Sequence, residues 1–175
     1  MEWKRLVDSI EYYKSNGFKW IDLNWTVPTN ISAITRPHDK KDFYINDKVL
    51  VASGEQAFIE LLFDSKISGR YVGMTPCFRD DELSAIHQQY FMKVELIDTE
   101  NVTQKSLIEI TNICLNFFNQ YVKCKVIRTP EGFDIVTDPG IELGSYGIRY
   151  NDRGSWIYAT GLAEPRLEIL IKNQK

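Results

Sequence analysis

The sequence contains few of the residues that build metal centres and disulfide frameworks, with three cysteines and two histidines in 175 positions. Cys77, Cys114 and Cys124 are odd in number, widely spaced and set in apolar segments, so they support neither a disulfide framework nor a zinc pattern. We expect buried, reduced thiols. His38 and His87 lie far apart in the chain, which argues against a histidine-based metal site.

An excess of basic residues is also missing, because the formal net charge is −3. That charge argues against a protein whose main function is to bind nucleic acid, and it is compatible only with a local basic patch. No apolar run approaches the roughly 18 residues of a membrane-spanning helix, and residues 1–5 lack the basic-then-apolar pattern of a secretory leader. We therefore expect a cytoplasmic protein without a membrane partner.

The chain does have the composition of a globular protein, 43% hydrophobic and 13% aromatic. Its length fits one domain, residues 1–175, with a substantial core and no room for a large second module. Internal repeats and low-complexity tracts are absent from the sequence.

Several segments carry apolar residues at helical spacing. Residues 3–15 form the first, and Gly17 is suited to a left-handed cap after it. Residues 103–121 form the longest, with an aromatic stripe that we assign to the core. A short helix follows residues 53–55, and another runs from Pro165 to the end, since proline is tolerated at a helix start.

Alternating or short apolar runs predict the strands. Between residues 30 and 47 the chain is polar and irregular, which is typical of a surface loop or a short hairpin. The predicted strands are 18–27, 49–52, 77–79, 90–96, 122–129, 132–137, 141–150 and 156–160. Antiparallel strand content with three or four helices indicates an α+β fold, an antiparallel β-sheet flanked by helices.

Residues 75–96 are the most informative stretch, because two apolar strands there border a short polar turn. Such a hairpin places Arg79 and Phe91 near each other on adjacent strands. An arginine fork can hold phosphate oxygens and an aromatic face can stack on a base, so the pair could hold ATP. The alternative is an ordinary hairpin with a surface Arg–Asp pair and a core phenylalanine, and this segment alone favours neither interpretation.

A motif in this stretch resembles a known family. Residues 78–81 (Phe-Arg-x-Asp), followed by His87, Phe91 and Glu95 at steps of four, resemble motif 2 of the class II aminoacyl-tRNA synthetases. The flanking residues make the resemblance closest to the seryl branch.

Further segments match the same family in the same order along the chain. Residues 159–166 resemble motif 3, where a glycine-bearing strand turns into a helix, and residues 140–145 resemble the Glu-x-Ser-Ser strand that binds ATP in seryl enzymes. The helix, glycine, strand and proline of residues 6–28 resemble motif 1, the dimerisation element. The resemblance thus implies the synthetase catalytic core and a homodimer through residues 6–28.

The resemblance also implies Mg²⁺-ATP as the ligand and gives roles to particular residues. Arg79 would bind the α-phosphate and the amino acid carboxylate, Arg166 would bind the γ-phosphate, and Phe91 would stack on adenine. Glu142 would hold Mg²⁺ near the phosphates, with Ser145 close by.

Two residues of the motif 2 segment complete the expected nucleotide site. His87 occupies a position that often contacts the γ-phosphate in the family, although Ile86 stands where an arginine is common. Asp81 stands where glutamate is usual, with Glu82 as a nearby substitute.

For the amino acid, the resemblance points to residues 53–55, which match a Thr-x-Glu loop with Ser53 for threonine. Glu55 would then hold the ammonium group, with Glu95 and Thr160 near the side chain. The alternative is a helix N-cap by Ser53 with Glu55 in the first turn, and both can hold together. Tyr158 stands in the segment that usually reads Asn-Gly-Ser or Asn-Gly-Thr, where it could reshape or fill the pocket.

Two tRNA-facing parts of seryl enzymes differ here. The loop 82–86 is far shorter than the seryl motif 2 loop, and we expect no long amino-terminal coiled-coil arm. We therefore expect ATP-dependent activation of a small amino acid and transfer to a carrier protein, a small molecule or an RNA. The alternatives are a non-catalytic paralogue that acts as a ligand-sensing subunit or dimeric adaptor, and a minimal seryl-tRNA synthetase that uses a separate tRNA-binding partner.

Overall fold

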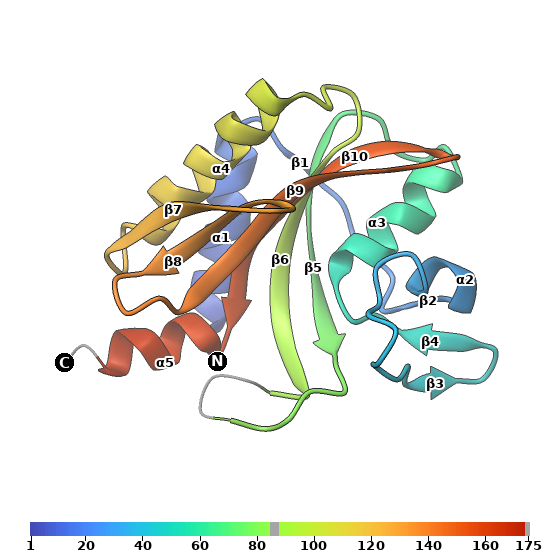
Figure 1. Ribbon diagram of the computed structural model, residues 1–175, viewed down its shortest axis with the longest axis horizontal. Coiled ribbons are helices and arrows are strands. Elements are labelled where there is room, and N and C mark those ends of the chain that lie inside the picture. The colour runs from blue at the N-terminus through green and yellow to red at the C-terminus, as the bar shows by residue number, and fades with distance from the viewer. Residues whose placement is uncertain (85–87, 174–175) are drawn as a thin grey trace.

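The computed structural model describes residues 1–84 and 88–173, so the predicted site residue His87 lies outside the described residues. Within those ranges the strands form two sheets (Figure 1): a large sheet of order β1-β5-β6-β10-β9-β8-β7 and a small sheet of order β2-β4-β3. Neighbouring strands are antiparallel, except that β1 runs parallel to β5. The α+β prediction, with an antiparallel-dominated sheet flanked by helices, is confirmed.

The helices are α1 (Trp3–Ser15), α2 (Thr29–Ser32), α3 (Gly54–Phe63), α4 (Gln104–Phe118) and α5 (Arg166–Asn173). The strands of the large sheet are β1 (Lys19–Trp20), β5 (Arg70–Phe78), β6 (Tyr90–Asp98), β7 (Cys124–Thr129), β8 (Gly132–Thr137), β9 (Glu142–Asn151) and β10 (Gly154–Glu164). The strands of the small sheet are β2 (Thr26–Pro28), β3 (Tyr44–Ile45) and β4 (Lys48–Leu50).

The larger hydrophobic core lies between one face of the large sheet and the helices α1, α4 and α5, which Figure 1 shows together at one end of the molecule. The two longest of these helices, α1 and α4, each begin at a residue whose side chain caps the first turn. Glu2 accepts from the Lys4 amide at 3.0 Å, and Thr103 accepts from the Ser106 amide at 3.1 Å. Buried apolar side chains on their inner faces then fix both helices against the sheet.

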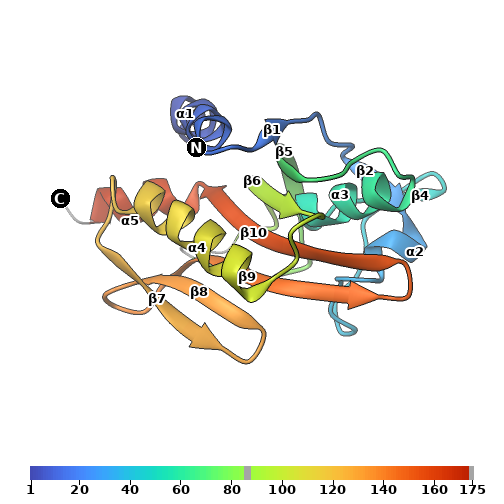
Figure 2. The ribbon, with the colours of Figure 1, turned by 90° about the horizontal axis from the view of Figure 1, so that it is seen from above.

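A second core holds α3 and the small sheet against the opposite face. Val49, Phe58 and Trp156 are fully or almost fully buried in it. Figure 2 shows β9 and β10 running from the α5 side of the molecule to the α3 side, so this strand pair spans both cores.

Strand β6 shows how the sequence separates these two faces. Val94 and Leu96 belong to the first core, whereas Ile97 belongs to the second. Because successive side chains of a strand point to opposite faces, Lys93 and Glu95 lie on the face away from α1 and α4. That face carries the candidate site.

The prediction of one strand over residues 18–27 is wrong. Residues 19–20 pair with β5 as β1, and residues 26–28 pair with β4 in the other sheet as β2. The chain leaves the large sheet after Ile21, whose amide still donates to Val72 at 3.1 Å. Leu23 then packs on Gly73 and reaches into the second core, and this burial diverts the segment.

The other predicted helices and strands are found with shifted ends, and the strand predicted over residues 77–79 is the end of the longer β5. The polar segment 30–47 includes the short helix α2, an irregular stretch and the β3–β4 hairpin, whose turn holds Asn46 at φ 54°. Strand β10 extends beyond the predicted 156–160 at both ends. Cys77 and Cys114 are buried free thiols, as predicted, and Cys124 is half-buried.

No helix in the described parts of the chain is both long enough and apolar enough to span a lipid bilayer.

Candidate functional site

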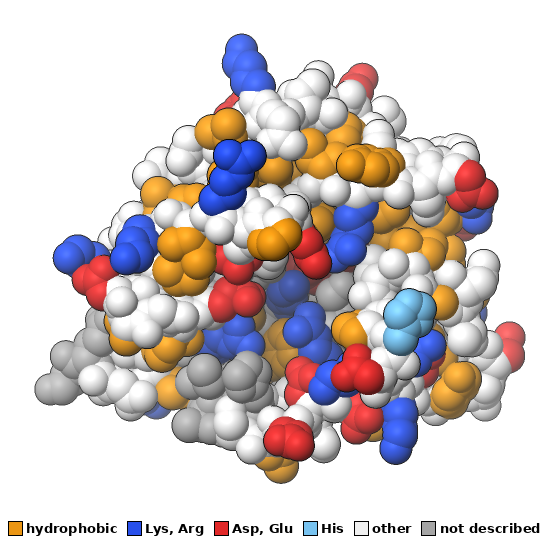
Figure 3. Space-filling model, viewed as in Figure 1, with side chains coloured by type: hydrophobic (Ala, Val, Ile, Leu, Met, Phe, Trp, Pro, Cys, Tyr) orange, Lys and Arg blue, Asp and Glu red, His pale blue; other side chains and the backbone are white. Residues whose placement is uncertain are grey.

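A cavity of about 280 Å³ opens on the sheet face opposite the larger core. Its walls come from β5, β6, β9 and β10, from the start of α3 and from the irregular segment 35–41. Figure 3 shows this face hollowed, with basic and acidic side chains gathered in the hollow. The predicted site residues that the structure describes all line the cavity: Ser53, Glu55, Arg79, Asp81, Phe91, Glu95, Glu142, Ser145, Thr160 and Arg166.

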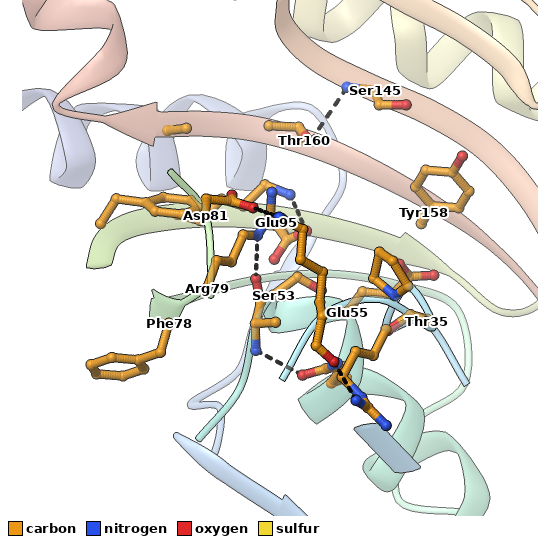
Figure 4. A pocket seen from close by; sticks show the side chains of 18 of the residues that line it. Thr35, Ser53, Glu55, Phe78, Arg79, Asp81, Glu95, Ser145, Tyr158 and Thr160 are labelled. Carbon is orange, nitrogen blue, oxygen red and sulfur yellow. Dashed lines mark hydrogen bonds and ion pairs between the residues drawn. The ribbon is translucent and has the colours of Figure 1, made fainter. Parts of the chain in front are cut away.

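Arg79 follows directly after β5, and its backbone amide extends the hairpin by donating to the Gln89 carbonyl at 2.9 Å. The Arg79 Nε donates to the Ala52 carbonyl at 2.9 Å, and the guanidinium lies 5.2 Å from the centre of the Phe91 ring. The proximity predicted for Arg79 and Phe91 is therefore confirmed. Figure 4 shows Arg79 in the cavity beside Ser53 and Asp81.

Arg166 is the first residue of α5 and reaches the same cavity from the other side. Its guanidinium donates to the Glu142 carbonyl at 3.2 Å and lies 3.9 Å from the Glu142 carboxylate. Burial lowers the pKa of Arg166, Glu142 and Asp81 raise it, and the positive charge of Arg79 lowers it further. Two guanidinium groups therefore act on each other within one partly desolvated hollow, an arrangement that favours an anionic ligand between them.

A buried ion pair positions the start of α5. Arg5 of α1 bonds to the fully buried carboxylate of Glu164, and its second amino group lies 2.9 Å from Glu168. Glu164 ends β10 and stands two residues before Arg166. Helix α1 thus fixes the position of the segment that carries Arg166.

Asp81 is held by a residue from the segment 35–41. Lys40 Nζ lies 2.9 Å from the Asp81 carboxylate and donates to the Asp80 carbonyl at 3.0 Å. Arg36 donates to the Lys40 carbonyl and pairs with Asp42 at 3.3 Å, which holds this segment against the cavity.

Glu55 lies in the first turn of α3 and is buried at the end of the cavity near Tyr158. Its Oε1 accepts from the Trp156 indole at 2.8 Å and lies 3.1 Å from the Nε of Arg149. Burial raises the pKa of Glu55, while Arg149 and the Trp156 indole oppose the rise.

Glu95 organises the turn before α3. One of its oxygens accepts from the Gly54 amide, and the other lies 2.7 Å from Lys93 Nζ. Ser53 occupies the N-cap position of α3 with Glu55 in the first turn, as the alternative interpretation predicts, although the Ser53 side chain makes no capping hydrogen bond. The Glu95 carboxylate supplies the contact at the helix start instead.

Thr160 and Tyr158 both lie on β10 and face the cavity. The Thr160 hydroxyl accepts from the Ser145 amide at 3.5 Å, as Figure 4 shows. The Tyr158 ring lies 4.5 Å from the Arg149 guanidinium. Tyr158 therefore bounds the Glu55 end of the cavity.

Sequence reasoning did not assign to the site the other cations that line the cavity, which are Arg36, Lys40, Lys41, Lys93 and Arg149. Lys93 could have been found from strand alternation, because it lies between Phe91 and Glu95 on the same face of β6. Arg149 follows Ser145 by four positions on β9 and shares its face by the same rule. Lys40 lies in an irregular segment, where no periodicity predicts direction.

Glu142 is the candidate Mg²⁺ ligand, and its side chain is about half exposed. Among the described residues no group of three or more histidine, cysteine, aspartate or glutamate side chains is placed to hold a metal ion. A single carboxylate fits Mg²⁺ that takes its other ligands from nucleotide phosphates and water.

Comparisons with solved structures show the fold. Seryl-tRNA synthetase from Pyrococcus horikoshii complexed with ATP is similar at TM-score 0.75 and 15% identity, over 95% of this chain and 49% of that one. Pyrrolysyl-tRNA synthetase from Desulfitobacterium hafniense is similar at TM-score 0.74 and 12% identity, over 97% and 69%. The cytoplasmic serine-tRNA ligase from Naegleria fowleri in complex with AMP is similar at TM-score 0.71 and 15% identity, over 94% and 52%.

The chain thus spans about half the length of these seryl enzymes. No curated protein matches its sequence. The model of the class II tRNA synthetase core domain (F) matches residues 38–169, which include the hairpin with Arg79, the strand with Glu142 and the helix start at Arg166. With that match over most of its length, the chain belongs to the family of class II tRNA synthetase core domains.

Proposed function

We propose that this chain binds ATP and a small amino acid, and joins them as an aminoacyl adenylate with release of pyrophosphate. The observation that carries the proposal is the convergence of Arg79 and Arg166 on one cavity, where their positive charges act on each other. Two of the similar structures are complexes with ATP and with AMP, which supports a nucleotide as the anion.

The reaction needs no protein nucleophile. An oxygen of the amino acid carboxylate attacks the α-phosphorus, a new P–O bond forms, and the bond from the α-phosphorus to the bridging oxygen breaks as pyrophosphate leaves with its electron pair. Alignment and charge neutralisation lower the barrier to such a step. In this proposal Arg79 holds the α-phosphate and the carboxylate, Arg166 holds the γ-phosphate, and Phe91 stacks on adenine.

Glu142 is the residue that would hold Mg²⁺, with Ser145 close by. Mg²⁺ supplies charge neutralisation of the triphosphate when it is bound. In the protein alone Glu142 accompanies Arg166, and this contact keeps the Arg166 side chain directed toward the cavity. Asp81 and His87 complete the nucleotide site in the proposal.

The amino acid would bind at the Glu55 end of the cavity. Glu55 Oε1 already takes two contacts, and Oε2 takes none from the other described residues, so Oε2 can accept from an ammonium group. Glu95 keeps the Ser53 turn in place through Gly54. Thr160 lies beside the space that the substrate side chain would enter.

The further parts of the proposal concern partners. The acceptor of the aminoacyl group is a carrier protein, a small molecule or an RNA, and the 175 residues act as one catalytic domain in the cytoplasm, which supplies ATP and free amino acids. A homodimer through residues 6–28 is supported by the exposed Val7 on α1 and Trp20 on the edge strand β1. Light scattering that gives the mass of one chain at micromolar concentration would reject the dimer.

One observation favours a non-catalytic paralogue as the second candidate. Lys93 already forms an ion pair with Glu95, and Arg149 already forms one with Glu55. Protein cations therefore lie where a substrate ammonium group is expected. A ligand-sensing or adaptor protein of this kind would bind ATP without turnover, or would not bind it at all.

The deciding experiment is ATP–pyrophosphate exchange with each of the twenty amino acids, combined with thermal unfolding in Mg²⁺-ATP. We expect exchange that depends on a small set of amino acids and that is lost in Arg79→Ala and Arg166→Ala. Arg128→Ala is the matched control, because Arg128 is exposed on β7 and does not line this cavity. ATP binding without exchange would favour the paralogue, and the absence of ATP binding would reject the enzyme.

A further inference from the structure

Arg149 is a cation of the cavity whose hydrogen-bonding capacity is largely unused. Its Nε lies 3.1 Å from Glu55 and its guanidinium lies 4.5 Å from the Tyr158 ring centre. Among the described residues its two terminal amino groups have no hydrogen-bond partner, and its side chain is 35% exposed, toward the cavity. An oriented guanidinium fork with free terminal amino groups is suited to a carboxylate.

The Tyr158 ring packs against this fork. Its hydroxyl lies above Gly147, where a Cβ atom would come within 2.6 Å of the Tyr158 oxygen and 2.7 Å of the Glu131 carbonyl. Because Gly147 has no side chain, the Tyr158 ring can pack closely against β9 and the β7–β8 turn. The guanidinium is held between that ring and the Glu55 carboxylate, so its free edge has a defined direction.

The carboxylates of Glu55 and Glu95 are each paired with a protein cation before any substrate binds. Glu55 lies 3.1 Å from Arg149 and Glu95 lies 2.7 Å from Lys93, and the charges of Arg149 and Lys93 both lower the pKa of Glu55 against the effect of its burial. An amino acid brings an ammonium group here, while its α-carboxylate goes to Arg79. A substrate ammonium group that binds Glu55 competes with Arg149 for that carboxylate, and an anionic side chain would give the Arg149 guanidinium a new partner.

We infer that the amino acid is one with an acidic side chain, whose carboxylate binds the terminal amino groups of Arg149 while its ammonium group binds Glu55 Oε2. This inference rests on the proposed function and names its substrate class. Lys93 contributes positive charge from the neighbouring strand, and it stays paired with Glu95 so that the Gly54 turn keeps its position.

The test compares each acid with its neutral amide in amino acid-dependent ATP–pyrophosphate exchange. Aspartate or glutamate should support exchange with a kcat/KM at least about 100-fold above that of asparagine or glutamine, because the amide is uncharged and offers the Arg149 fork only one acceptor oxygen. In Arg149→Leu this ratio should fall to near one. Arg153→Leu is the matched control, because Arg153 also stacks on an aromatic ring, Phe63, but lies outside the cavity, so it should keep the full ratio.

The ratio separates recognition from damage, since a merely misfolded variant loses exchange with the acid and the amide alike. Exchange with serine, alanine or asparagine that equals exchange with the acids would overturn the inference and leave the proposed function intact. A preference for phosphoserine over both acids would also overturn it, because the fork would then serve a phosphate.

Calorimetric titration of amino acids with a non-hydrolysable ATP analogue present separates the two hypotheses. If no amino acid supports exchange, the proposed function fails, but selective binding of an acid that depends on Arg149 would still support the acidic subsite. If the acids bind no better than their amides in this titration, the subsite inference is rejected whatever the exchange assay gives.

Discussion

Replacing Arg166 by alanine should separate nucleotide binding from folding. In the protein without ligand, burial and the nearby Arg79 both disfavour the charged Arg166, and only the contacts with Glu142 and the charge of Asp81 oppose them. The substitution removes these opposing effects together, so the melting temperature without nucleotide should stay unchanged or rise. This behaviour is typical of a charge placed for a ligand rather than for stability.

The effect with nucleotide can be worked out in magnitude. At an ATP concentration of about 100 times Kd, binding stabilises the folded state by about 2.7 kcal/mol. For a chain of this size that corresponds to a rise of roughly 5–10 °C in melting temperature. Loss of a charge-assisted phosphate contact worth about 2.7 kcal/mol weakens binding about 100-fold, which leaves roughly 0.4 kcal/mol and a rise of about 1 °C.

The assay is thermal unfolding of the wild type, Arg166→Ala and the exposed control Arg128→Ala, each with and without Mg²⁺-ATP. The control should retain the full nucleotide shift. If Arg166→Ala kept that shift, or if it lost several degrees without nucleotide, the reasoning about a shared phosphate site would be refuted.

Three more predictions test the support of the site. Arg5→Met should destabilise the fold by about 3–5 kcal/mol in urea titration, because it leaves the buried Glu164 carboxylate without its cation; a loss below about 1 kcal/mol would contradict this. Burial alone would raise the pKa of Asp98, but hydrogen bonds from the amides of Asn101 and Glu100 and from Arg70 and Ser106 lower it. The ionised Asp98 side chain therefore stabilises the fold at neutral pH, and this stabilisation is lost as the pH falls through the lowered pKa. Asp98→Asn should therefore cost stability at pH 7 and much less at about pH 2, and an equal cost at both values would count against the assignment. Gly147→Ala should cost about 1–3 kcal/mol because the new methyl group meets Tyr158 and the Glu131 carbonyl, and acid-over-amide selectivity should fall with it; an unchanged unfolding midpoint would argue against this packing.

The family motifs could be read from the sequence because each combines distinctive residues with a fixed position in a strand or helix. Arg79 and Phe91 come from a hairpin whose apolar borders fix its register, and the structure pairs Cys77 with Phe91 accordingly. Arg166 comes from a strand-to-helix junction marked by glycine and proline. The resemblance carried by these motifs therefore sufficed to predict that Arg79, Phe91 and Arg166 line one cavity, but it did not give Lys93 or Arg149.

The remaining features depend on contacts between distant parts of the chain. The path of residues 18–27 is set by Leu23 packing on Gly73, some fifty positions later, and nothing in the alternating pattern of the segment announces the break. Likewise, the Lys40–Asp81 pair joins an irregular segment to the end of a hairpin. Local periodicity carries no information about either contact, since both arise only when the sheets assemble.

The two sides of helix α1 make different contacts. Its outer side carries Trp3 and Val7 in water, while its inner side sends Arg5 to the carboxylate that precedes Arg166. A shift of α1 must therefore either move the β10–α5 junction with it or separate Arg5 from the buried Glu164 carboxylate. A second molecule that docks on the outer side of α1 would therefore change the position of Arg166, so the proposed dimer contact and the proposed nucleotide site would be coupled through this helix.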